Sequence, residues 1–280
     1  MIDFLIILAL IWLTFAVVQD FRQREIANWL NFSLIIFALA ARLFYSIFTN
    51  NFNYFFFGLY GLLVFFILGN LFYYMRLFAG GDAKLLIALG TILPFANNFY
   101  ENTLIFFVFT IGLLFAGAIY TLCYSFGLVL INRQRFVKEF RKQANKIKTT
   151  IIVLLISAVA IVIISILLNN IILSLIALLI FVTPFLYLYT KSVEQSYMMV
   201  YTSPTKVTIG DWIAETIHVG NVKIEPYWEG LNEEQVELIK KHYKKKILIK
   251  QGVPFSPSFL ISFLIVITIK YFYNSNWGFF

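Results

Sequence analysis

Long apolar runs separated by short polar segments dominate the pattern of this chain. A helix needs roughly 17–25 apolar residues to cross about 30 Å of hydrocarbon. The runs that approach or reach this length are residues 4–19, 29–48, 54–74, 103–131, 151–169, 171–189 and 255–273. A shorter run, residues 83–94, ends at a proline and predicts a short or half-submerged helix. The pattern therefore predicts an all-α polytopic membrane protein with about six to eight transmembrane helices.

The polar ends of these runs alternate between a basic and a non-basic kind, as expected for successive crossings. The basic ends contain Arg22, Arg24, Arg76, Lys84, residues 133–148 and residues 191–250, whereas residues 49–53, 95–102, 169–170 and 274–280 contain no Lys or Arg. The positive-inside rule predicts that the basic side is cytoplasmic and that the N-terminus lies outside. Arg42 and Lys270 are exceptions near outer helix ends, where we expect their long side chains to snorkel to the interface.

One polar block interrupts the pattern before the last run. It predicts a small cytoplasmic α+β domain over residues 191–254, with strands at 197–202, 206–209, 212–219 and 222–226 and a Gly220-Asn221 turn. Asn232 followed by acidic residues predicts a helix to about Lys246. Its basic end, residues 240–246, either complements the helix dipole or contacts anionic lipid. The predicted organisation begins with a membrane core at 1–131, a basic cytoplasmic loop at 132–150 and two membrane helices at 151–190. The cytoplasmic domain at 191–254 follows, and a last membrane helix with an outer C-terminus occupies 255–280.

Composition agrees with lipid as the main solvent. Of 280 residues, 61% are hydrophobic and only 13% charged, too few to cover a water-facing surface of this size. The net charge of +8 sits in short loops, which favours a topology signal over nucleic-acid binding. The single cysteine, Cys123, excludes a disulfide framework or a Cys-rich zinc site. Both histidines, His218 and His242, lie in the polar block, so no histidine serves chemistry at membrane depth. We expect no metal and no cofactor.

Two acidic residues stand apart from the rest. Eight of the fourteen belong to the polar block, and Asp3, Glu25, Glu101 and Glu139 lie on the outer side or beside basic residues. Asp20 ends the first apolar run and Asp82 opens the short helix, and the topology gives both the same depth. Taken singly, Asp20 could be a solvated interfacial residue and Asp82 a helix cap. A matched pair of acids at membrane depth instead indicates function.

The pair suits peptide hydrolysis by an activated water. Two close carboxyl groups share a proton, so that one acts as base and the other as acid. Asp82 opens a helix, where the dipole favours a negative charge, whereas Asp20 lies at a helix C-terminus. On this basis we expect Asp82 to be the charged base and Asp20 the protonated acid in the free enzyme. Gly80 and Gly81 directly before Asp82 would permit a sharp turn and close backbone approach.

Three segments resemble a known family. Residues 20–29, DFRQREIANW, are similar to the first-aspartate segment of type IV prepilin peptidases, and residues 79–84, AGGDAK, resemble the Gly-x-Gly-Asp motif that they share with presenilin-type intramembrane proteases. With residues 252–257, GVPFSP, the pattern is most similar to the archaeal prepilin and preflagellin peptidases. Ala79 replaces the first glycine of the motif, the Cys pairs of many bacterial relatives are absent, and about six spans are usual in that branch.

The resemblance implies an aspartyl protease of the cell membrane. Its substrates would be precursors of archaellins or type IV pilins, which carry a basic leader before a hydrophobic helix and are cut at the cytoplasmic face. Catalysis would fall to Asp20 and Asp82. Gly80 and Gly81, with Gly252, Val253 and Pro254, are candidates for substrate binding, although Gly252–Pro254 could equally be a loop that only leads into the last helix. The expected partners are these precursors and membrane lipid, with no nucleic acid.

Two other functions fit parts of the pattern. An ion- or proton-coupled transporter could use Asp20 and Asp82 as cation or proton sites, but such proteins more often carry charges near the bilayer midplane and internal repeats, and neither is evident here. A catalytically silent assembly protein of a pilus or secretion machine could use the polar block for docking. A cleavage assay separates these functions from a peptidase.

Overall fold

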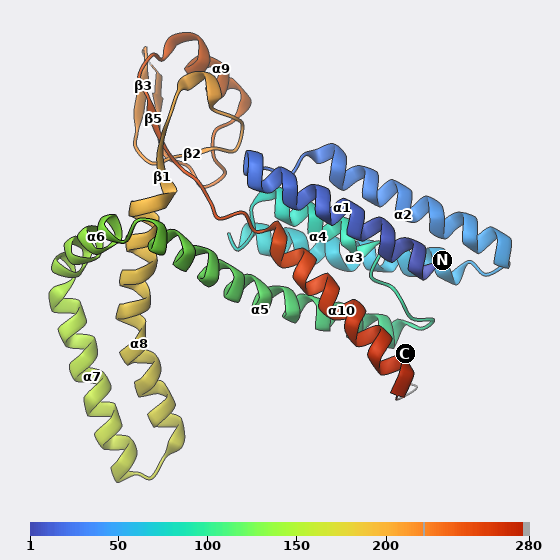
Figure 1. The fold of residues 1–280 in the computed structure, drawn as a ribbon, viewed down its shortest axis with the longest axis horizontal. Helices are drawn as coiled ribbons and strands as arrows, with labels where there is room; N and C mark the ends of the chain where they lie inside the picture. The colour runs from blue at the N-terminus through green and yellow to red at the C-terminus, as the bar shows by residue number, and fades with distance from the viewer. Residues whose placement is uncertain (221, 277–280) are drawn as a thin grey trace. The chain divides into compact units, whose positions relative to one another are not determined.

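The structure is a computed structural model that describes residues 1–220 and 222–276. In these residues the chain forms ten α-helices and five short strands (Figure 1). The helices are α1 (Ile2–Gln23), α2 (Asn28–Thr49), α3 (Asn53–Tyr74), α4 (Gly80–Gly90), α5 (Phe99–Ile131), α6 (Arg133–Lys146), α7 (Lys148–Leu167), α8 (Ile171–Val193), α9 (Glu233–His242) and α10 (Ser256–Asn276). The strands are β1 (Met199–Thr202), β2 (Trp212–Ile213), β3 (Ile217–Val219), β4 (Val222–Ile224) and β5 (Ile247–Lys250). The predicted fold class, a helical membrane protein with a small α+β region, is confirmed.

Six helices in the described residues, α1, α2, α3, α5, α7 and α8, are long and apolar enough to cross a membrane. The protein is therefore a multi-pass membrane protein, within the predicted range of spans. Helix α10 is apolar over residues 256–272. Helix α4 has 11 residues and is about 16 Å long, which is shorter than a hydrocarbon core.

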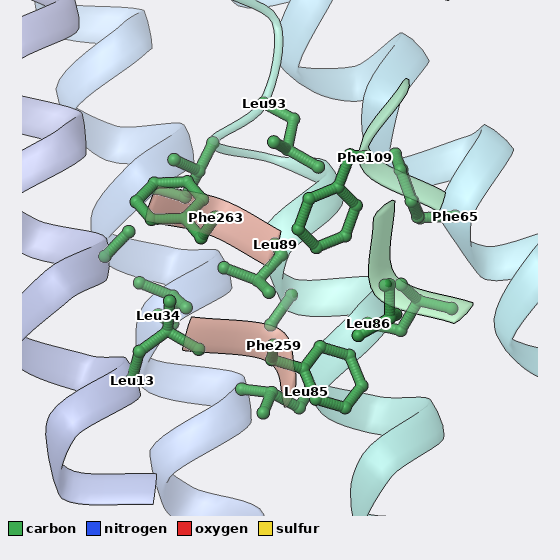
Figure 2. Close-up of a cluster of buried hydrophobic side chains, with 14 of the residues drawn as sticks. Leu13, Leu34, Phe65, Leu85, Leu86, Leu89, Leu93, Phe109, Phe259 and Phe263 are labelled. Atoms are coloured by element: carbon green, nitrogen blue, oxygen red, sulfur yellow. The ribbon is translucent and has the colours of Figure 1, made fainter. Parts of the chain in front are cut away.

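The chain divides into two compact units, of which the first joins Met1–Cys123 to the described residues from Val253 onward. Here α1 contacts α2 and α10, and α4 packs against α2 and α3. Figure 2 shows Leu85, Leu86 and Leu89 of α4 within a cluster that also includes Leu13 and Phe263. Every residue of α4 from Ala83 to Gly90 is buried or half-buried except Lys84, so this short helix lies inside the bundle.

Glycines set the distance between α3 and α4. A Cβ atom on Gly61 would collide with the carbonyl oxygen of Gly90, and a Cβ on Gly90 would lie 2.5 Å from the carbonyl oxygen of Gly61. One on Gly69 would lie 3.0 Å from the carbonyl oxygen of Ala83. Because small residues let helix backbones approach closely in a membrane, these positions fix the depth of α4 against α3.

Arg42 does not snorkel to the interface, so the expectation for this residue was wrong. Its side chain is fully buried in unit one. The guanidinium donates to the carbonyl oxygens of Thr91, Ile92 and Pro94 at 2.7, 3.0 and 2.8 Å, and to that of Tyr54 at 3.1 Å. Non-helical backbone at membrane depth must find its hydrogen bonds inside the protein. Arg42 supplies these hydrogen bonds to the carbonyl groups of the segment that follows α4.

The second unit comprises residues 124–252. The segment 132–150, expected to be a loop, instead contains helix α6, because one of its faces packs on α8 through Phe136 and Tyr189, whose ring centroids are 5.8 Å apart. Helices α7 and α8 form a contacting pair.

The strands of the second unit form two small antiparallel sheets, with orders β1-β5-β2 and β3-β4. β5 was not expected, and Lys206–Ile209 is not a strand. The expected helix from Asn232 begins with a full capping box between Asn232 and Gln235 but ends at His242, so Lys240, Lys241 and His242 of the basic run lie in its last turn and the remaining lysines lie beyond it. In the expected Gly220-Asn221 turn, Gly220 has φ +60 and Asn221 lies outside the described residues.

Candidate active site

Asp20 lies in the last turn of α1 and is almost completely buried. Its Oδ2 accepts a hydrogen bond of 2.9 Å from the backbone N–H of Ser256, the first residue of α10. The chain turns directly after this helix, where Arg24 adopts a left-handed conformation with φ 57 and donates its N–H to the carbonyl oxygen of Asp20. The side chain of Asp20 therefore joins the end of the first helix to the beginning of the last.

Asp82 is the third residue of α4 and is half-buried. The backbone N–H of Ala79, the residue that precedes the helix, donates a hydrogen bond to its carboxyl group. A side chain at this helical position commonly reaches back to the capping residue in this way. The carboxyl groups of Asp82 and Asp20 interact electrostatically. The structure thus brings together the two acids that the sequence singles out.

The structure removes the reason for expecting Asp82 to be the charged base and Asp20 the protonated acid. That expectation gave Asp82 a favourable helix N-terminus and Asp20 none. In the structure the side chain of Asp20 also meets a helix N-terminus, that of α10, through the Ser256 amide. Since a helix N-terminus stabilises negative charge, the helix dipole favours the ionised form of both carboxyl groups. The dipole argument therefore assigns neither base nor acid.

Gly80 and Gly81 form the first turn of α4 with negative φ angles, so the turn itself does not require glycine. A Cβ on Gly81 would lie 3.4 Å from the Cβ of Ile26, and one on Gly80 would lie 3.8 Å from Tyr73. Both are ordinary contacts. The expected close approach is therefore limited to Gly81 and the loop that follows α1, and the tight glycine contacts of this bundle lie instead at Gly61 and Gly90.

Residues 7–122 match a model of the type IV leader peptidase family. This part of the chain is similar to that family. No curated protein and no solved structure matches the chain. The matched segment covers most of α1, all of α2 to α4 and most of α5, and it contains both aspartates. It ends one residue before the boundary of the first unit, so that the second unit and α10 lie outside the match.

Two asparagines accompany the aspartates in the type IV leader peptidase segment. Asn28, the first residue of α2, accepts a hydrogen bond of 2.7 Å from Nζ of Lys84, which ties the first turn of α2 to that of α4. Lys84 is exposed and serves as this link. Asn31 is fully buried, and neither polar atom of its side chain has a hydrogen-bond partner in the described residues.

The run Gly252–Pro254 leads into α10. Gly252 is exposed at the end of the second unit, whereas Pro254 is buried in the first. Phe255 packs on Phe78, with ring centroids 5.3 Å apart. The sequence therefore indicated the right segment, but the residue that contacts Asp20 is Ser256, which sequence reasoning missed. The signal in the sequence was its position in residues 252–257, two residues after Pro254.

The described residues contain no group of three or more His, Cys, Asp or Glu side chains that could hold a metal ion. Chemical groups at this site include the two carboxyl groups and the backbone amides that bind them. They can hold a proton and activate a water.

Proposed function

We propose that this protein is an intramembrane aspartic endopeptidase that removes the basic N-terminal leader from type IV prepilin-like or archaellin precursors. Its family supports a leader peptidase activity. The interaction between the carboxyl groups of Asp20 and Asp82 carries the aspartic assignment, because they come from two different helices of an otherwise acid-poor bundle. Two such groups share one proton, which is the state that acid–base hydrolysis needs.

The reaction needs one ionised and one protonated carboxyl group. The ionised group takes a proton from water as the water oxygen adds to the peptide carbonyl carbon, and the protonated group gives its proton to the carbonyl oxygen. Collapse of the resulting diol breaks the C–N bond: the carboxyl group that is now ionised takes a proton from one diol hydroxyl, and the other carboxyl group gives its proton to the departing nitrogen. The backbone amides of Ala79 and Ser256 hold the two carboxyl groups in place for these transfers.

The positive-inside pattern supports cleavage at the cytoplasmic face of the cell membrane. Arg22 and Arg24 follow Asp20, and Lys84 follows Asp82. A precursor with a hydrophobic helix can enter the lipid beside the bundle, while its basic leader stays in water on the same side as the aspartates. Gly81, with Val253 and Pro254 in the segment before α10, is a candidate for contacts to the extended substrate backbone.

A cleavage assay tests this proposal. Membranes that contain the protein are incubated with an archaellin-type and a pilin-type precursor, and products are identified by the mass of the released leader. We expect cleavage by the intact protein and no cleavage by Asp20→Asn or Asp82→Asn. Asp3→Asn is a matched control, because it places the same change at the other end of α1, where asparagine can still accept the hydrogen bond from Tyr271.

Precursors with altered leaders define the substrate class. Replacement of the leader's Lys and Arg by Gln is expected to slow cleavage, and removal of the hydrophobic helix is expected to abolish it. Full cleavage by either aspartate variant would reject the dyad. Failure of the intact protein to cut both precursor types would reject the proposed substrates.

A further inference from the structure

The first turn of α10 combines two features that the proposed dyad does not explain. The amide of Ser256 binds Asp20, and the hydroxyl of Ser256 is fully buried without a hydrogen-bond partner in the described residues. An unpaired buried hydroxyl costs free energy, and it is available to bind a water or another ligand. This one belongs to the residue that contacts a candidate catalytic acid.

We propose that the first turn of α10 is a third component of the active site. The Ser256 amide fixes the Asp20 carboxyl group, and the Ser256 hydroxyl binds the water that the two acids activate. This inference rests on the proposed function and adds a residue that lies outside the matched family segment. It also gives residues 252–257 a specific role, in which the loop positions Ser256.

The local packing makes this turn rigid. Phe255 contacts Phe78 and Phe259, and a Cβ on Gly117 would lie 2.5 Å from the Phe255 ring, so a glycine of α5 leaves room for that ring. Pro257 fixes the backbone of the first turn and has no N–H of its own. The N–H of Ser258 bonds to the carbonyl oxygen of Phe255. Ser256 is therefore the residue of this first turn whose amide bonds outside the helix.

Ser258 provides a matched comparison. Its hydroxyl is equally buried and equally unpaired in the described residues. Residues two apart on a helix point about 200° apart, so Ser256 and Ser258 occupy different faces. Ser262, one turn after Ser258 on its face, donates to the carbonyl oxygen of Phe109 on α5. The Ser258 face is thus turned to α5, whereas Ser256 lies on a different face and its amide bonds to Asp20.

A purely structural reading makes Asp20 only a cap for α10. The two readings differ for asparagine, which caps helices as well as aspartate does. Amide hydrogen exchange of Ser256 in the full-length protein reports the bond directly. We expect faster exchange in Asp20→Ala and near-normal exchange in Asp20→Asn. Unchanged exchange in Asp20→Ala would overturn the role of the amide.

Kinetics in the reconstituted full chain test the hydroxyl. In Ser256→Ala we expect kcat to fall by about tenfold or more, with little change in KM, because a bond to the reacting water acts in the transition state. Ser256→Thr retains a hydroxyl and should recover most of the rate. Ser258→Ala should stay close to the intact protein. Equal rates for Ser256→Ala and Ser258→Ala would overturn this role.

Ser256→Pro separates the amide from the hydroxyl. Proline is favoured at the first position of a helix but has no N–H, so it removes the bond to Asp20 in addition to the hydroxyl. We expect a lower rate than in Ser256→Ala, and an equal rate would contradict the amide's part. The proposed function is tested separately: if Asp20→Asn cleaves normally, the dyad itself fails, whereas an inactive Asp20→Asn with a normal Ser256→Ala removes only this inference.

Discussion

Arg42 on α2 donates a hydrogen bond of 2.7 Å from Nε to the carbonyl oxygen of Thr91, the residue that ends α4. The last carbonyl groups of a helix have no partner within it, and those of α4 end inside the bundle. A side chain 49 residues earlier therefore closes the helix that carries Asp82. Gly58 leaves the space for this side chain, since a Cβ there would lie 2.5 Å from Cδ of Arg42.

Arg42→Leu should lower the free energy of unfolding by about 3–5 kcal/mol, because it leaves several buried carbonyl groups unpaired. Unfolding in detergent measures the change, and the cleavage rate should fall with it because α4 loses its fixed end. Arg42→Lys keeps the charge but lacks the fork that reaches several carbonyl groups, so its loss should be intermediate. Equal stability of Arg42→Leu and the intact protein would contradict the buried hydrogen bonds.

Gly61→Ala should destabilise the fold by about 1–3 kcal/mol or more, because the added Cβ meets the backbone of Gly90, which cannot move without shifting α4. Gly127→Ala is the control. It lies within helix α5, and a Cβ there meets nothing within 4 Å, so it should be neutral or stabilise by up to about 1 kcal/mol. Thermal unfolding of both variants in the same detergent provides the comparison, and a tolerated Gly61→Ala would show that the two helices are further apart.

Gly81→Ala separates folding from substrate binding. A Cβ at this position makes only ordinary contact with Ile26, so the melting temperature should stay close to that of the intact protein. If the substrate backbone passes over Gly81, KM should rise by about tenfold, a loss of roughly 1.4 kcal/mol. Gly80→Ala, with more space around it, is the paired variant. Normal KM values in both would remove the two glycines from the substrate site.

Topology can be tested by cysteine labelling. The chain has one cysteine, so Cys123→Ser provides a cysteine-free background. Glu25→Cys and Asn51→Cys then place exposed thiols at the two ends of α2. In intact cells an impermeant maleimide should label the residue 51 thiol, and it should label the residue 25 thiol only after lysis. The reverse result would place the aspartates on the outer face.

Much of the fold follows from local pattern. Apolar runs of sufficient length can satisfy their backbone only as helices in lipid, which is why the spans were predictable. The helix start at Asn232 is set by contacts between neighbours in sequence, and it was predicted for the same reason. Helix α6 was missed because its polar sequence suggested a loop, whereas packing of one face on α8 decides its structure.

Some parts of the candidate site could be predicted from the sequence, and others depend on contacts that the sequence does not reveal. Asp20 and Asp82 could be found because charged groups are rare in apolar sequence. The Ser256 amide could not, since it joins residues 236 positions apart and involves the backbone rather than a distinctive side chain. Arg42 was misjudged because its partners are carbonyl groups of a later turn, which no pattern of side chains reveals. Strand β5 was not predicted, because the lysines that precede it match the basic end expected for the helix from Asn232.

The bond between Asp20 and Ser256 also has a consequence for biosynthesis. Ribosomes deliver α1 to the membrane first and α10 last, so for most of translation Asp20 has no helix to meet. A nascent or truncated chain holds both acids but lacks the amide and hydroxyl of residue 256. The proposed active site is therefore complete only after α10 has been inserted.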